Sequence, residues 1–534
     1  MKSKYSLLGV YAIIALLASS CEKILVEEPR NSTYLDAFWQ SSRDVRSGLA
    51  GNYALLRNAV TSGNFNGAGR HYMYGDAVAR NYFTIDYSGD GLEGIQGGDF
   101  TFQYNIESYG DWTSFYKAIA MSNIILKQVP EIDDALLADE ENTVRFKNEV
   151  IGQALFIRAL SYFLMVRVWG DVPLVTEAYD DPISAPQLPR TAKEEVMAQI
   201  ENDCHEAARL LSWGYRNIAE AKVMANRGSV YALLAHLYLW RATTSDLGSD
   251  QPNMNDVYSA DTTIQALKDF GGYRQTDTSN YYSTFIGRSP DGIFELAASE
   301  DNREGSNRHI ASFFLRKQYI DYNSPTYSRF HVNPAYLANH FYKLAKEWGW
   351  VWSGTEWEWL EYDTKVIDTA DIRFRRNFTD INTNQPTCIK YSNVVYRNPG
   401  QLQDAYLSNN IIVFRYSDML LLEAEIALYR DEVDKARTII NTFRTRNGAS
   451  PSGLVKAGLT KNEVMYEYML ERGKELYLEG HLFFDLIRTR QYPQFVDWLS
   501  TDRFRQGGFY WPAAPQLFRN NLQLTQTPYW RGKV

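Results

Sequence analysis

The chain has 534 residues, a formal net charge of -9, and 37 Tyr, 26 Phe and 13 Trp residues. A moderately acidic chain argues against nucleic acid as a partner and against charge-driven binding to anionic lipid. Three cysteines are too few for a disulfide framework. Cys204 lies in a helix-like run and is interpreted as a buried small hydrophobe, while a bridge to Cys388 stays open.

The N-terminus has the pattern of an exported protein. Lys2 and Lys4 precede an apolar run at 7–17, and small residues then lead to Cys21. The apolar run is shorter than the roughly 20 residues that span a bilayer. We interpret residues 1–20 as a signal peptide and Cys21 as a lipidated mature N-terminus, as in a bacterial lipobox; the alternative is an ordinary secreted protein. The predicted protein is lipid-anchored without a spanning helix.

Helical periodicity recurs along the chain, and the predicted helices tend to come in pairs. The segment Glu149–Trp169 is apolar nearly all round, which predicts a buried helix that ends at Gly170. Thr191 is positioned to cap the next helix, with Glu194 at capping-box spacing, and this helix runs to about Leu211. The other predicted helices span residues 112–129, 222–241, 257–270, 416–429 and 433–446.

Small residues recur at helical spacing within these segments, for example Gly228, Ala232 and Ala235. They share one helix face, where a partner helix can approach closely. We therefore predict a single domain at 21–534 with a mainly α fold, a tetratricopeptide-like helical-hairpin solenoid with long irregular, loop-rich insertions. The predicted scaffold covers residues 36–60, 112–270 and 411–492, and the predicted ligand-binding insertions cover residues 61–109 and 271–410.

The later insertion contains a cluster of tryptophans. They are Trp348, Trp350, Trp352, Trp357 and Trp359. Alternation places the first three on one side of an extended strand. Indole rings supply flat, rigid surface suited to stacking on sugar faces or peptide side chains. We predict ligand contacts at Trp348, Trp350, Trp352 and Trp357; the alternative is a small tryptophan core beneath a loop.

A second candidate site is the early loop, residues 70–82. Its predicted ligand-binding residues are Tyr72, Tyr74, Asp76, Arg80 and Tyr82. Tyrosine rings would supply a stacking face and the two charged groups would bond sugar hydroxyls. The alternative is an Asp76–Arg80 ion pair that holds the loop. Tyr281, in the later insertion, is a further predicted contact.

Other chemical signatures do not build a site. The turn at 86–91 has several positions of a calcium loop, but Gly97 stands where its glutamate belongs, so a polar turn is favoured. The charged run at 471–488 has the spacing of ion pairs within a helix and is interpreted as structural. No metallohydrolase, serine-hydrolase, P-loop or Rossmann pattern occurs, and neither cofactor nor metal is predicted. Glycoside hydrolysis needs only two carboxylates, for which the first candidates are Glu356, Glu358, Glu361 and Asp363, beside the tryptophans.

Six ordered blocks of the chain, and a further segment at its C-terminus, share the pattern of one known family. The clearest block is GQALFIRALSYFLMVRVWGDVPLVTE at 152–177. The C-terminal WPAAPQLFRNNLQLTQTPYW is also similar, although Trp511, Ala513 and Ala514 depart from the commoner form. The other five blocks span residues 21–39, 115–126, 414–428, 440–448 and 471–492. Together these segments resemble the SusD/RagB family, nutrient-binding outer-membrane lipoproteins of Bacteroidetes.

The resemblance implies a fold of tetratricopeptide-like helices packed against irregular insertions. It also implies a capture module or lid on a SusC-type TonB-dependent transporter, facing the cell exterior at the outer membrane. The family's ligand is usually an oligosaccharide and sometimes a peptide, and in sugar-binding members the early loop supplies an aromatic and polar groups. We expect a binding protein and not an enzyme; a peptide-capture protein, a glycoside hydrolase and an assembly scaffold are the alternatives.

Overall fold

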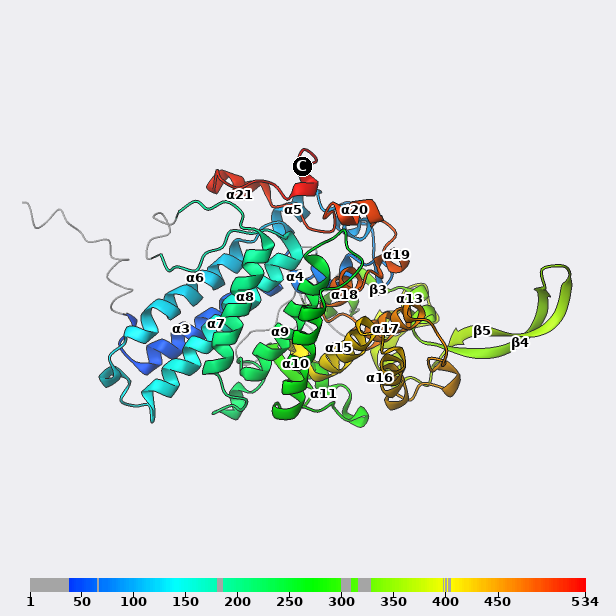
Figure 1. The fold of residues 1–534 in the computed structure, drawn as a ribbon, viewed down its shortest axis with the longest axis horizontal. Coiled ribbons are helices and arrows are strands. Elements are labelled where there is room, and N and C mark those ends of the chain that lie inside the picture. Colours follow the sequence, from blue (N-terminus) through cyan, green and yellow to red (C-terminus); the bar gives the residue numbers. More distant parts are fainter. Residues whose placement is uncertain are drawn as a thin grey trace, which may run out of the picture.

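The computed structural model of the chain describes residues 38–64, 67–179, 186–298, 309–315, 328–396, 398, 401 and 405–534. The predicted signal peptide at 1–20 and the predicted lipid anchor on Cys21 lie outside these ranges. Figure 1 shows a broad body of packed helices, from which one hairpin of long strands extends outward.

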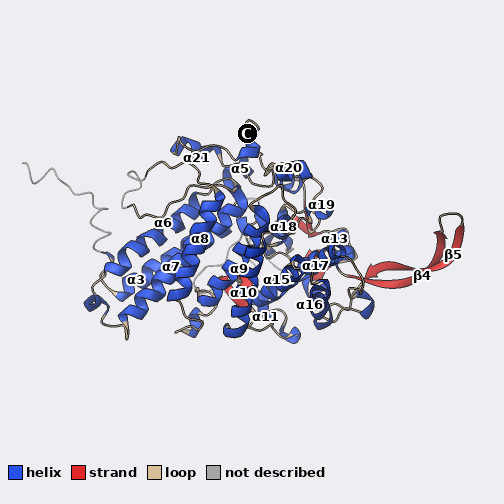
Figure 2. Cartoon of the chain, in the orientation of Figure 1, coloured by secondary structure: helices blue, strands red, loops and turns tan. Residues whose placement is uncertain are grey.

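Helices dominate the body (Figure 2), which confirms the predicted mainly α fold. The helices are α3 (Ser42–Thr61), α4 (Arg70–Tyr72), α5 (Gln103–Tyr109), α6 (Thr113–Gln128), α7 (Thr143–Trp169), α8 (Lys193–Leu210), α9 (Arg227–Thr244), α10 (Met254–Phe270), α11 (Ser283–Ile286), α12 (Ala311–Phe314), α13 (Pro334–His340), α14 (Ile372–Asn377), α15 (Tyr416–Tyr429), α16 (Val433–Arg446), α17 (Lys461–Glu475), α18 (Leu482–Arg488), α19 (Tyr492–Phe495), α20 (Thr501–Arg505) and α21 (Pro515–Asn520).

The strands are short except in one hairpin, and all form two-stranded sheets. The pairs are β1–β3, β2–β10, β4–β5, β6–β7 and β8–β9, all antiparallel. The strands are β1 (Phe83–Ile85), β2 (Gly292–Leu296), β3 (Phe330–Val332), β4 (Tyr342–Trp352), β5 (Trp357–Ile367), β6 (Phe378–Thr379), β7 (Thr387–Cys388), β8 (Val394–Tyr396), β9 (Ala405–Leu407) and β10 (Ile411–Arg415).

The long helices pack in the order in which the chain makes them. α3 contacts α6, and contacts continue in sequence through α7, α8, α9, α10, α15, α16 and α17. Stacking of each helix on its neighbours is typical of a solenoid. Helix α7 is long and apolar enough to span a membrane. However, 78% of its most apolar stretch is buried inside the fold, so it is the core helix that the sequence predicts. The division into scaffold and insertions stays a prediction.

The predicted cap of α8 is wrong. This helix begins at Lys193, its N-cap is Ala192, and Thr191 instead forms a β-bridge with Val172. Asp171 Oδ1 accepts a hydrogen bond from the Lys193 amide at 2.9 Å, so the preceding loop supplies the missing acceptor. Complete capping boxes are present at α9 and α17.

Both Cys204 and Cys388 are buried free thiols, so the two do not form a bridge. Burial raises the pKa of the Cys388 thiol to about 12. A thiol that stays protonated is a poor nucleophile. Burial also raises the pKa of the Cys204 thiol well above its ordinary value, so Cys204 is the small buried hydrophobe that the sequence predicts.

Buried ion pairs join the C-terminal helices to the inserted segments. Arg373 Nη1 lies 2.7 Å from Glu471 Oε1 and 2.8 Å from Glu475 Oε2. Arg415 reaches Glu475 at 2.9 Å and Glu479 at 2.7 Å. We call the whole set the buried charge network: Asp291, Asp371, Arg373, Lys390, Arg415, Asp418, Glu425, Arg444, Glu467, Glu471, Arg472, Lys474, Glu475, Glu479, Asp485 and Arg488.

Most of these pairs connect different elements, which corrects the prediction of pairs within one helix. Carboxylates of α17 meet guanidinium groups from α14, β10 and α16, and only pairs such as Arg488–Asp485 lie within a helix. Burial alone would raise the pKa of Glu475, but the Arg415 and Arg373 guanidinium groups outweigh it and hold that pKa at about 2. The network is structural, as the sequence indicates, and it braces the array against the insertions.

The early loop is held by the C-terminal part of the chain. A π-helical turn at Met73–Ala77 packs against Gly480. A Cβ atom on Gly75 would lie 2.1 Å from the carbonyl oxygen of Gly480, so the two backbones touch only because residue 75 has no side chain. The Tyr477 hydroxyl also donates to the Tyr82 carbonyl oxygen at 3.0 Å.

Replacing Arg373 with methionine should destabilise the protein by roughly 3–5 kcal/mol, because Asp371, Glu471 and Glu475 then lose a buried counter-charge. The midpoint of urea unfolding, followed by circular dichroism, measures the loss. R209M is the control, since the Arg209–Glu206 pair is exposed to solvent and contributes little to stability. Equal midpoints for the two variants would contradict this account of the network.

Stability should also fall in acid because four histidines are buried without charge. Burial lowers the pKa of His71, His309, His340 and His481 from the ordinary 6.5 to about 3. Between these values the unfolded chain binds protons that the folded chain does not. The free energy of unfolding is therefore highest above pH 6.5 and decreases as the pH falls toward about 3.

The H340Q variant tests this pH dependence. Proton uptake on unfolding, measured from the pH dependence of the melting temperature, should decrease by about one proton in this window. H205Q is the control, because the His205 side chain is 60% exposed in the folded protein. An unchanged pH slope in H340Q would show that the His340 ring gains its proton without unfolding.

Candidate functional site

The hairpin of β4 and β5 projects from the helical body (Figure 1), and its outer part contacts no other element that the drawing shows. The strands pair in unbroken register from Tyr342 opposite Ile367 to Trp352 opposite Trp357. Aromatic residues favour extended strands. The turn closes with a hydrogen bond from the Ser353 amide to the Glu356 carbonyl oxygen at 2.9 Å, and Gly354 takes a positive φ of 101°.

One side of this hairpin carries all five clustered tryptophans, and we call it the tryptophan face: Trp348, Trp350, Trp352, Trp357 and Trp359. Their exposed fractions lie between 52% and 63%. The rings of Trp350 and Trp359 meet edge to face with centroids 5.5 Å apart, and those of Trp352 and Trp357 are 5.6 Å apart. The predicted alternation is confirmed, and the alternative of a buried tryptophan core is wrong.

The opposite face is mixed in character. Tyr362 packs beside Gly349, where a Cβ atom would lie 2.9 Å from the tyrosine ring. The Tyr362 hydroxyl is 3.5 Å from Glu347 Oε2, and Leu360 is exposed. The aromatic surface for stacking is therefore concentrated on the tryptophan face.

The base of the hairpin is fixed to the body. The Tyr342 hydroxyl donates to Glu467 Oε1 at 2.7 Å, and Glu467 in turn pairs with Arg444 at 2.6 Å. The Ser452 hydroxyl donates to the Leu344 carbonyl oxygen at 2.9 Å. The hairpin thus starts from the buried charge network, which orients it relative to the helices.

The early loop is not an exposed binding surface, which corrects the prediction for four of its residues. Tyr72, Tyr74, Asp76 and Tyr82 are all buried. The Tyr74 hydroxyl donates to the Tyr109 carbonyl oxygen at 2.6 Å, and Tyr72 Oη lies 3.1 Å from His309 Nε2. The Tyr82 ring packs against Tyr336 and His340. These rings face protein partners and offer no stacking surface to a ligand.

Asp76 and Arg80 do not form the alternative ion pair. Asp76 Oδ2 accepts a hydrogen bond from the Gly480 amide at 2.8 Å, whereas Arg80 lies at the surface. Burial raises the pKa of the Asp76 carboxyl well above its ordinary value. Arg80 is the one predicted residue of the early loop that is exposed.

Tyr281 is also buried, and the prediction that it contacts a ligand is wrong for the same reason. Its hydroxyl accepts a hydrogen bond from Asn377 Nδ2 at 3.0 Å, and its ring packs edge to face against Phe285. Trp359 is the fifth indole of the tryptophan face, and the sequence alone does not assign it to the site. Its position opposite Trp350 depends on the strand register, which the spacing of the Trp348–Trp352 strand alone does not give.

The turn at 86–91 has its carboxylates engaged by protein. Asp90 pairs with Arg329 at 2.5 Å, and Asp86 Oδ1 lies 2.6 Å from His331 Nε2. These partners sit on or beside β3, next to β1. The interpretation as a polar turn accounts for these residues without calcium.

Three buried side chains could in principle hold a metal, namely His236, Asp418 and His481. His236 Nε2 lies 2.7 Å from Asp418 Oδ2, and Arg472 Nη1 lies 2.8 Å from Asp418 Oδ1. The Arg472 guanidinium already supplies positive charge to this carboxylate and would repel a cation. We interpret the group as part of the buried charge network.

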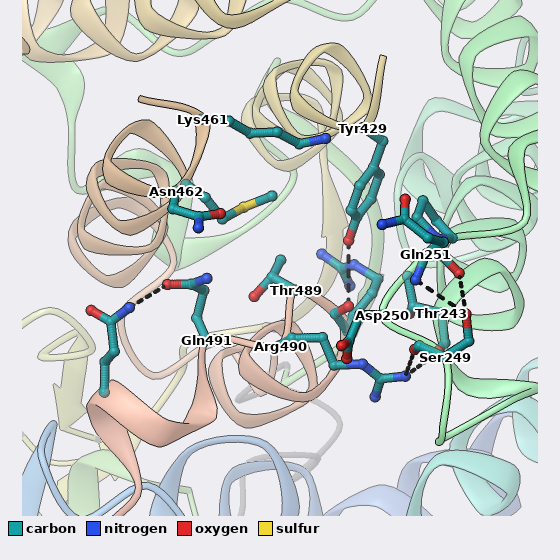
Figure 3. Close-up of a pocket in the computed structure, with 14 residues that line it drawn as sticks. Thr243, Ser249, Asp250, Gln251, Tyr429, Lys461, Asn462, Thr489, Arg490 and Gln491 are labelled. Atoms are coloured by element: carbon teal, nitrogen blue, oxygen red, sulfur yellow. Dashed lines mark hydrogen bonds between the residues drawn. The ribbon is translucent and has the colours of Figure 1, made fainter. Parts of the chain in front are cut away.

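A polar cleft of about 490 Å³ opens between the α9–α10 connection, the start of α17 and the segment after α18 (Figure 3). Two of its charged groups are already bonded: Arg490 Nη2 donates to the Ser249 carbonyl oxygen at 3.2 Å, and Lys461 pairs with Asp431 at 2.8 Å. Its aromatic ring, Tyr429, has its hydroxyl 3.3 Å from the Arg488 carbonyl oxygen. No predicted site residue lines this cleft, and the tryptophan face remains the candidate site.

Comparisons with known proteins agree on one family. A family model described as "Starch-binding associating with outer membrane" matches residues 76–239, and a model described as "SusD family" matches residues 347–530. A SusD-like protein, P38, of Formosa agariphila is 26% identical over 96% of this chain and 96% of its own length. A second, SusD-like protein P25 of the same organism, is 24% identical over 90% of this chain and 89% of its own.

Solved structures share the fold. A SusD homolog from Bacteroides thetaiotaomicron is 24% identical, with a TM-score of 0.73 over 92% of this chain and 98% of its own. NanU of B. fragilis is 19% identical, with a TM-score of 0.63 over 93% of this chain and 98% of its own. Likenesses at this level of identity establish the fold of the chain.

Limited oxidation with N-bromosuccinimide should modify five indoles rapidly, because all thirteen tryptophans are described and only those of the tryptophan face are more than half exposed. Peptide mapping of the oxidised protein identifies the sites. A variant with residues 346–363 replaced by an Asn-Gly turn is the control: it should lose the fast phase and keep its helical circular dichroism. Slow reaction of Trp350 and Trp359 would refute the exposed hairpin.

Proposed function

Because the chain belongs to the SusD/RagB family, we propose that it binds a nutrient glycan at the cell surface and delivers it to a SusC-type TonB-dependent transporter in the outer membrane. The family description of starch binding and outer-membrane association supports this proposal. A lipid on Cys21 would tether the protein to the outer membrane and leave the helical body outside. A peptide ligand is the second candidate, because indoles also stack on peptide side chains.

The observation that carries the proposal is the tryptophan face. Five half-exposed indoles on one face expose apolar surface to water, which is costly unless the surface serves binding. A pyranose ring can lie flat on an indole, and neighbouring polar groups then bond its hydroxyls. Capture followed by delivery favours fast release, so dissociation constants from micromolar to millimolar, about -8 to -4 kcal/mol, are suitable.

The geometry favours binding over hydrolysis. A glycosidase needs two carboxylates that flank the scissile bond within a shaped site. Glu356 lies in the exposed turn, and Glu358, opposite Val351, points away from the tryptophan face. Glu361 and Asp363 are exposed on the tryptophan side, where Asp363 pairs with Lys346 at 2.9 Å. We therefore propose capture by stacking and hydrogen bonds, without covalent chemistry.

Calorimetry against soluble starch, hydroxyethyl cellulose, xylan, laminarin, galactomannan and a peptide library tests this function. The W350A/W359A double variant should bind the identified ligand at least tenfold more weakly, a loss of about 1.4 kcal/mol or more. The reason is that both rings proposed to stack on the ligand are removed. F270A is the control, since Phe270 is 65% exposed on α10 and its loss removes a ring without touching the hairpin.

Three outcomes separate the candidates. If only peptides bind, the ligand is a peptide and the glycan proposal is wrong. Release of sugar products would indicate a hydrolase. Binding that W350A/W359A leaves unchanged would move the site away from the tryptophan face.

A further inference from the structure

Acidic residues outnumber basic ones in the outer part of the hairpin, which carries the tryptophan face. From residue 347 to residue 361 the hairpin has four acidic residues and no Lys, Arg or His. Three of the four are exposed and Glu358 is half-buried. The acidic residues are Glu347, Glu356, Glu358 and Glu361.

The cation that lies closest in sequence is already engaged. Lys346 Nζ lies 2.9 Å from Asp363 Oδ1 and 3.9 Å from Glu361 Oε2. Lys456, from the body, approaches the same Asp363 carboxylate at 3.5 Å. Among the described residues no Lys or Arg forms an ion pair with Glu347, Glu356 or Glu358, so the outer part of the hairpin keeps a net negative charge.

The register places two of these carboxylates, those of Glu356 and Glu361, close to any molecule on the indoles. Glu347 and Glu358 project from the opposite face of the hairpin. Glu361 is directly opposite Trp348, and residues opposite each other in an antiparallel pair project from the same face about 5 Å apart. Glu356 is next to Trp357 at the turn. A ligand on the tryptophan face therefore lies within about 10 Å of these carboxylates, the screening length in about 0.1 M salt.

We infer that the tryptophan face selects glycans without negative charge and rejects polyanionic ones, such as chains of uronic acids or sulfated sugars. The inference rests on the proposed function and specifies its substrate class. Sugar hydroxyls donate hydrogen bonds to ionised carboxylates, which accept only. Carboxylate or sulfate groups of a ligand would instead meet like charge, because residues 347–361 contain no guanidinium or ammonium group and Lys346 is already paired with Asp363.

Matched polymers test this selectivity. Each uncharged polymer that binds in calorimetry, for example soluble starch or hydroxyethyl cellulose, is compared with its carboxymethylated form. In about 0.01 M salt, where the screening length is about 30 Å, the carboxymethylated form should bind at least tenfold more weakly. In about 1 M salt, where that length is about 3 Å, the difference should shrink to threefold or less.

A charge variant locates the cause. Changing the four hairpin glutamates to glutamine (E347Q/E356Q/E358Q/E361Q) should narrow the ratio between the two forms at low salt to threefold or less. The control E107Q/E131Q/E141Q/E195Q makes the same change in net charge at exposed positions on the body and should leave the ratio as in the wild type. The W350A/W359A variant is measured with the same polymers. Any binding that it retains does not use the tryptophan face.

The outcomes separate this inference from the proposed function. Equal binding of both forms at low salt, still lost in W350A/W359A, would overturn the inference and leave glycan capture in place. Failure of every polymer to bind through the tryptophan face would overturn glycan capture and the inference with it. If only a lysine-rich peptide bound there, the negative surface would belong to a protein partner, which would also overturn the inference.

Discussion

The buried charge network sets the geometry of the C-terminal half of the molecule. Each guanidinium group in it meets carboxylates from other elements, as when Arg373 of α14 bonds Glu471 and Glu475 of α17. Buried charges are tolerated only with nearly complete pairing, so few relative positions of these elements are acceptable. The same network reaches the hairpin through Tyr342 and Glu467, and the orientation of the binding surface thus depends on the interior of the helical array.

It is unusual for a two-stranded hairpin to project into solvent without packing on a third strand or a helix. An isolated two-stranded ribbon is marginally stable in water. Here the anchored base supplies the starting register, and the edge-to-face pair of Trp350 and Trp359 adds about 0.5–1.5 kcal/mol beyond burial. The tryptophans therefore stabilise the ribbon that presents them, while more than half of each side chain stays open to solvent.

The sequence predicted what depends on local spacing and missed what depends on distant contacts. Period-two alternation is a local property. The strand at Trp348–Trp352, with its three indoles on one side, could therefore be predicted directly from the spacing of the tryptophans. The helices at 416–429 and 433–446 followed equally from their periodicity. The prediction for the early loop was wrong because residue type alone does not reveal that Tyr72 and Asp76 are buried. Their partners, His309 and Gly480, are distant in the sequence.

The contact of Gly75 with Gly480 has a consequence for how the chain matures. Two backbones that touch across some four hundred positions cannot meet until the last portion of the polypeptide has been supplied. Contacts of such sequence separation form late and slowly. In an incompletely synthesised or clipped chain, the π-helical turn would lack the Gly480 backbone on which it packs. The aromatic residues around this turn would then be exposed to proteases and to association with other unfinished chains.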